Sequence, residues 1–394
     1  MPEPIYLDHA ATTPIRPEVR EAMEPFLGPR FGNPSSAHRW GREARAALDE
    51  ARARLAACLG AAPDEICFTS GGTEGDNQAI FGPWRARRAE GRHAIVTTRI
   101  EHKAVLEAVH HAAAEGAAER LVPVDARGIV KGDEFAAAVR DDVAVCSVMW
   151  VNNEVGVVQP IETLGAHAKA AGAVFHTDAV QAFGKLPIDC ASLPIDLLTL
   201  SGHKIGAPKG IGALYVRRGT PLEPLLFGGA QDRGRRPGTE NVAAAVALAT
   251  AAELAVAERE ESCARLAALR ERLETVILEA APEAQINGRG APRAPHICSV
   301  TIMGLDGDAL LMGLDLQGIA ASGGSACQTG SPSASHVLVA MGVNPGVAKA
   351  SARFSVGAGN TAAEIERLGA LLPGLVQKAR EAMRWREQQP ASWW

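Results

Sequence analysis

The sequence of 394 residues lacks the features of membrane and nucleic-acid-binding proteins. Its most apolar helical stretch, residues 242–257, is mostly alanine and contains Glu253, so it is too short and too weakly hydrophobic to cross a bilayer. The net charge of -5 is spread along the chain without a polybasic block, which argues against nucleic acid or an anionic membrane as a partner. Because no basic and apolar leader stands at the N-terminus, we expect a cytoplasmic protein that acts on a small molecule.

Paired cysteines are missing as well. The seven cysteines are an odd number, and no two of them form a C-x-x-C motif, so we expect neither a disulfide framework nor a metal site. Most lie in apolar stretches, as Cys67 and Cys146 do, where a buried and inert thiol is the ordinary state. Cys327 differs, because the small and polar residues of Ser-Gly-Gly-Ser-Ala-Cys-Gln-Thr-Gly (322–330) predict an exposed thiol in a mobile loop.

The chain does contain an alternation of β-branched runs and alanine-rich helical patterns. This alternation predicts an α/β fold with a mainly parallel sheet that is covered by helices on both faces. The expected strands are residues 65–69, 93–98, 120–124, 143–150, 173–177, 197–200 and 212–216. The expected helices include residues 37–58, 102–115 and 161–171, followed by a long helical stretch at 241–280. Further strands near 297–302 and 353–356 predict a smaller α+β domain at the C-terminal end.

A candidate phosphate site is the segment Phe-Thr-Ser-Gly-Gly-Thr-Glu (68–74), where a strand ends in glycines and a helix begins. Backbone N–H groups at a helix N-terminus, with the hydroxyl of Thr73 next to Gly72, form a cup for a phosphate. The segment matches neither a Walker loop nor a dinucleotide fingerprint. Taken alone, it is equally compatible with an ordinary strand-to-helix turn.

A candidate Schiff-base lysine is Lys204, in Ser-Gly-His-Lys (201–204). It follows an apolar strand, at the edge where open α/β sheets bind ligands, and a partly desolvated amine readily attacks a carbonyl. Ser201 and His203 are placed to hold a phosphate on the same side. By itself, however, a lysine in such a position is usually an ordinary surface residue.

A third candidate is the pair Asp178 and Gln181, which follows the expected strand at 173–177. Pyridoxal phosphate (PLP) needs an anion against its ring nitrogen, so that the ring stays protonated and withdraws electrons. Asp178 supplies that charge, and Gln181 is placed to hydrogen-bond the ring hydroxyl. The rival interpretation is that Asp178 caps a helix N-terminus.

In their order along the chain, these motifs resemble those of the NifS/IscS-type cysteine desulfurases, which are PLP enzymes of the aminotransferase class V group. The resemblance runs from about residue 5 to residue 380. It rests on Leu-Asp-His-Ala-Ala-Thr-Thr (7–13), Phe-Gly-Asn-Pro-Ser-Ser (31–36), Gly-Gly-Thr-Glu (71–74), Glu-His-Lys (101–103), Asn-Asn-Glu-Val-Gly (152–156), Ser-Gly-His-Lys (201–204) and Arg-Pro-Gly-Thr-Glu-Asn (236–241).

The resemblance implies the fold type I of PLP-dependent transferases, with a mainly parallel, seven-stranded sheet flanked by helices and a smaller α+β domain. It divides the chain into three parts. Residues 1–15 would pack with the small domain, residues 16–255 would form the large PLP-binding domain, and residues 256–394 would form the small domain that carries Cys327.

The resemblance also assigns roles around the cofactor. Lys204 would bind PLP covalently, His102 would stack on the ring and relay protons, and Asp178 would pair with the ring nitrogen. Asn153 and Gln181 would steady the ring and its hydroxyl.

Phosphate and substrate have their own implied residues. Thr239 would reach the phosphate of a partner subunit, so a homodimer with composite sites is implied. Arg353 would bind the substrate carboxylate through its guanidinium fork, with Asn33 nearby. The implied phosphate ligands of the same chain are Gly72, Thr73, Ser201 and His203.

The implied activity is removal of sulfur from L-cysteine, which leaves L-alanine and a persulfide on Cys327 for an acceptor such as an iron–sulfur scaffold or a sulfur-relay protein. Gln328 and Thr329 stand where two small hydroxyl residues are expected, which leaves the choice of acceptor open. One alternative is a selenocysteine lyase or another class V enzyme of the same fold. An alternative of another class is a non-catalytic sulfur-transfer scaffold.

Overall fold

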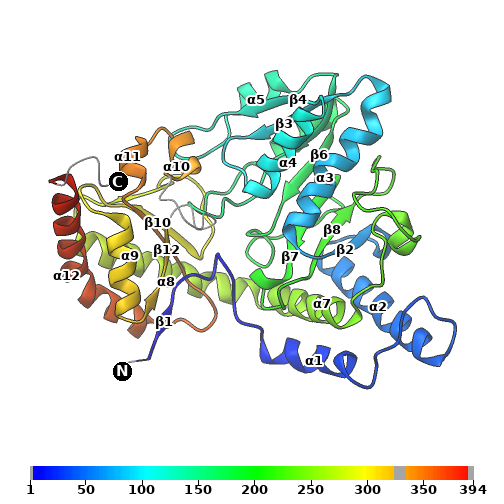
Figure 1. Ribbon diagram of the computed structural model, residues 1–394, viewed down its shortest axis with the longest axis horizontal. Helices are drawn as coiled ribbons and strands as arrows, with labels where there is room; N and C mark the ends of the chain where they lie inside the picture. The colour runs from blue at the N-terminus through cyan, green and yellow to red at the C-terminus, as the bar shows by residue number, and fades with distance from the viewer. Residues whose placement is uncertain (1–2, 324–333, 389–394) are drawn as a thin grey trace.

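The computed structural model describes residues 3–323 and 334–388, so Cys327 lies outside the described residues. Figure 1 shows a larger part on the right, built around a seven-stranded sheet, and a smaller part on the left, built around a four-stranded sheet. Helices α7 (Val242–Ala257) and α8 (Arg259–Ala280) run one after the other below both parts. Within the described ranges, every helix is too short or too polar to cross a membrane.

The large sheet has the strand order β2-β8-β7-β6-β5-β3-β4. Strand β8 is antiparallel to both of its neighbours, and the other neighbouring pairs are parallel, which confirms the mainly parallel sheet. The strands are β2 (Ile66–Thr69), β3 (Ala94–Thr98), β4 (Ala118–Val122), β5 (Val143–Ser147), β6 (Val174–Asp178), β7 (Leu197–Ser201) and β8 (Gly212–Val216). Strand β5 ends three residues before the expected boundary, because the N–H of Met149 donates to the Glu101 carboxylate instead of to a strand.

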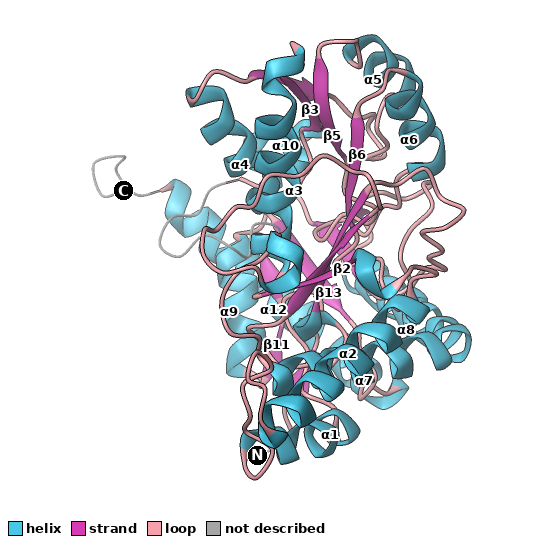
Figure 2. Ribbon diagram, turned by 90° about the vertical axis from the view of Figure 1, so that its right-hand side faces the viewer, coloured by secondary structure: helices cyan, strands magenta, loops and turns pink. Residues whose placement is uncertain are grey.

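Alternate residues of each central strand pack on opposite faces of this sheet, as the pleat requires. On β3, Ile95 packs with residues of α3 and α4, whereas Val96 belongs to the cluster that contains α2, α6 and α7. Figure 2 shows α3 and α4 on one side of the strands and α5 and α6 on the other. The helices of this part are α1 (Pro17–Leu27), α2 (Arg39–Cys58), α3 (Gly72–Arg87), α4 (Lys103–Ala114), α5 (Gly132–Ala138), α6 (Ile161–Ala170) and α7.

The helical stretch expected at 241–280 consists of two helices, because the chain leaves α7 at Glu258 and begins α8 at Arg259. Two nitrogens of Arg16 contact the two carboxylate oxygens of Glu258 at 2.7 and 2.8 Å. The residue at this break is therefore held by the N-terminal segment.

The smaller part contains an antiparallel sheet with the order β12-β13-β10-β9. A second pairing, between β1 (Ile5–Tyr6) and β11 (Ile319–Ala320), brings the N-terminal segment to this part, where Ile5 and Leu7 join the buried cluster of α8, α9 and α12. The remaining elements are β9 (Gln285–Ile286), β10 (Ile297–Thr301), α9 (Gly307–Leu316), β12 (Ser322–Gly323), α10 (His336–Ala340), α11 (Pro345–Ala348), β13 (Ser351–Ser355) and α12 (Ala362–Glu387).

Candidate active site

Three of the predicted site residues meet at the carboxyl end of the large sheet. Asp178 is the last residue of β6, Lys204 ends the short helix after the neighbouring parallel strand β7, and His102 caps α4. Burial raises the pKa of Asp178, and the positive charges of His102 and Lys204 act in the opposite direction. Since charges interact strongly only over short distances in a protein interior, the three side chains form one electrostatic unit.

The orientation of Lys204 and His102 follows from backbone contacts. The Lys204 amine donates to the carbonyl oxygens of Ala10 and Ala11, both at 2.6 Å. The Nδ1 atom of His102 accepts the N–H of Ala104 at 3.1 Å, so a neutral His102 ring carries its proton on Nε2. Both side chains are thus held in one direction by groups of the main chain.

A network of buried polar side chains lies behind Asp178, and the sequence analysis missed it. The His176 ring bonds the hydroxyls of Ser147 at 2.8 Å and Thr199 at 2.9 Å, and burial lowers its pKa to about 3. Asp76 of α3 lies 3.7 Å from this ring, and its pKa is raised by burial and by the charge of Asp178. The available signal was His176, a polar residue in the middle of a buried strand.

The predicted phosphate cup lies at the start of α3, where Gly72 and Thr73 are the first two residues. A Cβ built on Gly72 would be 3.6 Å from the Cβ of Ser201 and 3.1 Å from Val180, so the glycine lets this turn approach the end of β7. His203 contacts Thr12 through Nδ1 at 3.1 Å, and burial lowers its pKa to about 4. His203 would therefore act on a phosphate as a neutral hydrogen-bonding group.

Two further residues surround the cup. The Glu74 carboxylate accepts the N–H of Ser70 at 2.8 Å and the Nε–H of Arg236 at 3.0 Å, so its negative charge is paired. Thr239 is exposed and lines, together with Ser70 and Arg236, a cavity of about 240 Å³. The motif that contains Thr239 thus lies next to the cup of its own chain.

Gln181 connects the site to a histidine that the sequence analysis did not identify. Its Nε2 donates to the carbonyl of Ala10 at 2.8 Å, and its Oε1 lies 3.1 Å from Nε2 of His296. Ala10 therefore accepts hydrogen bonds from both Gln181 and Lys204. His296 stands just before β10, and no local motif marks it.

The predicted substrate arginine, Arg353, lies on β13 with 2% of its surface exposed. Its Nη2 donates to Oδ1 of Asp8 at 2.8 Å, and its Nη1 donates to the carbonyl oxygen of Asn153 at 2.9 Å. The other oxygen of Asp8 accepts the Ser322 hydroxyl at 2.7 Å. The Nε atom of Arg353 has no hydrogen-bond partner in the part of the chain that the structure describes. Arg353 and Asn153 are thus neighbours, with Asp8 as an additional partner.

Within one chain, Asn33 does not lie near Arg353. It is exposed in the loop between α1 and α2, where its Oδ1 accepts the N–H of Ser35 at 2.9 Å. Figure 1 places this loop at the opposite end of the molecule from the small sheet. A contact between Asn33 and Arg353 therefore requires a second chain.

Comparison with known proteins identifies the family to which this chain belongs. The aminotransferase class-V model matches residues 5–368. The cysteine desulfurase IscS of Methanosarcina thermophila is 47% identical over 376 residues, which cover 95% of this chain and 93% of that protein. The chain belongs to the cysteine desulfurases of the aminotransferase class-V family.

Solved structures agree with this assignment. A NifS-like protein superimposes with a TM-score of 0.87 at 35% identity, covering 97% of this chain and 100% of that chain. The structure of SspA in complex with cysteine has a TM-score of 0.79 at 36% identity and covers 89% of this chain and 98% of that chain. The α/β fold with a smaller C-terminal part is therefore the fold of the family.

Two buried glutamates lie beside these residues. Glu154 accepts the Ser335 hydroxyl, and burial raises its pKa to about 7. Glu101 accepts the Thr98 hydroxyl at 2.6 Å, and burial raises its pKa to about 8. His336 contacts the carbonyl oxygen of Glu101 at 3.0 Å. The residues immediately after the undescribed segment are thus bound to the region around Asn153.

Proposed function

We propose that the protein is a PLP-dependent cysteine desulfurase, which converts L-cysteine to L-alanine and keeps the sulfur as a persulfide on Cys327. The observation that carries the proposal is the meeting of Asp178, Lys204 and His102 at one edge of the large sheet, next to the N-terminus of α3. The names of the relatives and the cysteine bound to the SspA structure support the substrate.

The residues present fit PLP. Gly72 lets the N-terminus of α3 approach Ser201 closely, so that the backbone N–H groups and the Ser201 hydroxyl could bind one phosphate, and the buried Asp178 carboxylate provides the anion for a protonated ring nitrogen. Thr73, Ser201 and His203 would hold the phosphate, and Gln181 would bond the ring hydroxyl. When bound, PLP supplies an electron sink for the bonds at the substrate α-carbon.

The chain's own residues then account for the remaining chemistry. Lys204 would hold the cofactor and, once the substrate amine displaces it, would accept the α-proton; the carbonyls of Ala10 and Ala11 keep its amine in place. His102 would exchange a proton with the substrate thiol through Nε2. Arg353 would bind the carboxylate by exchanging its bond to Asp8, with Asn153 beside it.

Sulfur transfer falls to Cys327, which lies outside the described residues. In the proposed step, the Cys327 thiolate attacks the substrate sulfur, because the thiolate is the reactive form. A sulfur–sulfur bond forms while the bond between sulfur and Cβ breaks. The released electron pair returns to Cβ, and its protonation produces the methyl group of alanine.

Exposed apolar side chains support a homodimer. Phe227 has 85% of its surface exposed, and four more large apolar residues of the large part are at least 46% exposed. Isolated exposed apolar residues are ordinary, but several large ones in one part of a molecule favour an interface. A partner subunit here would also bring a second Asn33 loop and a second Thr239 to the site. The four further residues are Leu27, Phe31, Trp40 and Leu226.

The persulfide requires an acceptor, and we propose a sulfur-accepting protein, either an iron–sulfur scaffold or a sulfur-relay protein. The outer sulfur of a cysteine persulfide is transferred when another thiolate attacks it. The acceptor must therefore present a cysteine or a comparable nucleophile.

The proposal is tested with Cys327→Ser, measured against Cys58→Ser, which changes a partly buried thiol. Cys327→Ser should keep the yellow colour of the wild-type protein but release no sulfide from L-cysteine with a reductant. Cys58→Ser should keep the colour and release sulfide as the wild type does. Mass spectrometry of wild-type protein exposed to L-cysteine should find one added sulfur on the Cys327 peptide. Undiminished turnover by Cys327→Ser would remove this residue from the mechanism, and transfer of the alanine amine to a keto acid would favour an aminotransferase.

A further inference from the structure

A cavity of about 430 Å³ lies on the side of Lys204 toward the junction of α7 and α8. Its walls are the N-terminal segment, the turn after β6, the start of α8 and the loop after β13. Of the residues predicted for the active site, Gln181 and Lys204 line it. Its volume is within the range of small-molecule sites. The cavity therefore adjoins the active site without containing the phosphate cup, Asp178 or Arg353.

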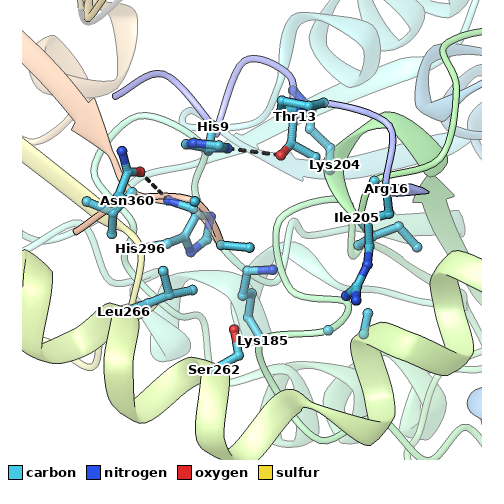
Figure 3. A pocket seen from close by; sticks show the side chains of 18 of the residues that line it. His9, Thr13, Arg16, Lys185, Lys204, Ile205, Ser262, Leu266, His296 and Asn360 are labelled. Carbon is cyan, nitrogen blue, oxygen red and sulfur yellow. Dashed lines mark hydrogen bonds between the residues drawn. The ribbon is translucent and has the colours of Figure 1, made fainter. Parts of the chain in front are cut away.

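The polar side chains of this cavity include two that have unused hydrogen-bonding groups. Lys185 makes neither an ion pair nor a side-chain hydrogen bond with any residue in the described ranges. His296 is 4% exposed, and its Nδ1 has no partner among these residues. Figure 3 shows the side chains of Lys185, His296, His9 and Lys204 around one space. A buried polar atom without a partner, such as Nδ1 of His296, is uncommon in folded proteins.

The lining has three cationic side chains, Arg16, Lys185 and Lys204, and two carboxylates, Glu258 and Glu364. Burial lowers the pKa of Lys185, and the charge of Lys185 contributes to the lowered pKa values of His9 and His296. The two carboxylates of the lining have other partners: Glu258 pairs with Arg16, and Glu364 accepts the Asn360 amide at 3.2 Å and the N–H of Thr361 at 2.8 Å. Among the described residues, neither carboxylate contacts the Lys185 amine.

The rest of the lining indicates the shape of the missing anion. Phe183, Leu266 and Val356 make one part of the wall apolar, and Ser262 adds a single hydroxyl near Lys185. One amine and one hydroxyl match the two oxygens of a carboxylate, whereas a phosphate dianion would need more donors. A short aliphatic chain matches the apolar wall.

We propose that this cavity binds a small aliphatic carboxylate, with its charged end at Lys185 and Ser262 and its apolar end at Phe183, Leu266 and Val356. The site is connected to the active site through His296, which contacts Gln181, and through Ala10, which accepts from Gln181 and Lys204. Three contacts, from His296 to Gln181, from Gln181 to Ala10 and from Ala10 to Lys204, therefore join the cavity to the amine that would hold the cofactor.

The test is calorimetric titration of the cofactor-loaded protein with isobutyrate. Saturable binding of one isobutyrate per chain is expected, and Lys185→Met should weaken it by about tenfold or more, since a hydrogen-bonded charge is lost. The matched control is Lys378→Met, on an exposed position of α12, which should bind as the wild type does. The uncharged analogue isobutyramide and inorganic phosphate should not compete. Absence of saturable binding, or equal binding by Lys185→Met, would overturn the proposal.

Arg353→Met separates this cavity from the predicted substrate site. If isobutyrate occupies the cavity, Arg353→Met should still bind it. If Arg353→Met loses binding and Lys185→Met retains it, the carboxylate lies at Arg353 and the proposal is wrong.

A measurement on wild-type protein avoids any folding defect of a variant. Saturating isobutyrate should slow acetylation of Lys185 by an N-hydroxysuccinimide ester, as followed by peptide mass spectrometry, and leave Lys378 unaffected. Equal acetylation of Lys185 with and without isobutyrate would contradict the site.

Discussion

The two ends of the proposed active site hold their charged side chains in different ways. Asp178 is surrounded by groups of the large sheet and its helices: the Val180 N–H donates to it at 2.9 Å, and the network of His176 and Asp76 lies behind it. Arg353 is held between the two parts, since Asp8 comes from the N-terminal segment and Asn153 from the loop after β5. The cofactor end is thus built by one sheet, and the substrate end by contacts between distant segments.

This difference separates binding of the cofactor from binding of the substrate. The groups around Asp178 are fixed by the large sheet and its helices, and electrostatic stabilisation requires such fixed groups. A substrate carboxylate, in contrast, must compete with Asp8 for the Arg353 guanidinium. Substitutions at the two ends should therefore change different kinetic and spectroscopic quantities.

The largest effect is expected at the cofactor end. Asp178→Asn keeps the shape of the side chain and removes its charge, so kcat should fall by about 100- to 1,000-fold and the visible absorption should change. Asp133→Asn, on the exposed first turn of α5, is the matched control. Steady-state kinetics with L-cysteine measure the effect, and near-normal kcat for Asp178→Asn would mean that the anion at the ring nitrogen lies elsewhere.

A pH-dependent effect is expected at Glu154, near the substrate end. Its pKa rises from 4.5 to about 7 in the folded protein, so folding favours the protonated acid, and the free energy of unfolding should fall as the pH rises from about 4.5 to 7. The shift corresponds to about 3 kcal/mol. Glu154→Gln should lose this fall, whereas Glu134→Gln, on the exposed side of α5, should retain it. Urea unfolding at several pH values measures the difference, and parallel curves for wild type and Glu154→Gln would refute it.

A smaller effect, on substrate binding alone, is expected at Arg353. Arg353→Met should raise the KM for L-cysteine by about 10- to 100-fold, because a charged hydrogen bond to the carboxylate is lost. The yellow colour of the protein should be unchanged. Loss of colour in this variant would show that the two ends are not separate.

The smallest effect is expected at Asp8, the residue that competes with the substrate. Asp8→Asn should lower the KM for L-cysteine by about two- to fivefold, since the guanidinium is released from a neighbouring charge. A rise in KM as large as that of Arg353→Met would instead assign Asp8 the task of holding the arginine in position.

The sequence predicted the large sheet and the neighbouring positions of Asp178 and Lys204, because both depend on local patterns. Alternating apolar runs mark the strands, and Asp178 and Lys204 each follow one, so the meeting of parallel strand ends places them together. The substrate end was predicted less completely. Asp8 meets Arg353 across 345 residues of sequence, and His296 meets Gln181 across 115, and no local pattern reports such contacts.

The division at Glu258 was missed for a similar reason. Its neighbours favour helix on both sides, so no local pattern marks the break, and its contact with Arg16 joins residues that are 242 positions apart.

The most direct test of the account is to identify the lysine that holds the cofactor. The yellow protein is reduced with borohydride and digested, and its peptides are sequenced by mass spectrometry. The account predicts a phosphopyridoxyl group on Lys204 and on no other lysine. A phosphopyridoxyl group on Lys185 or Lys209, or none on any peptide, would contradict it.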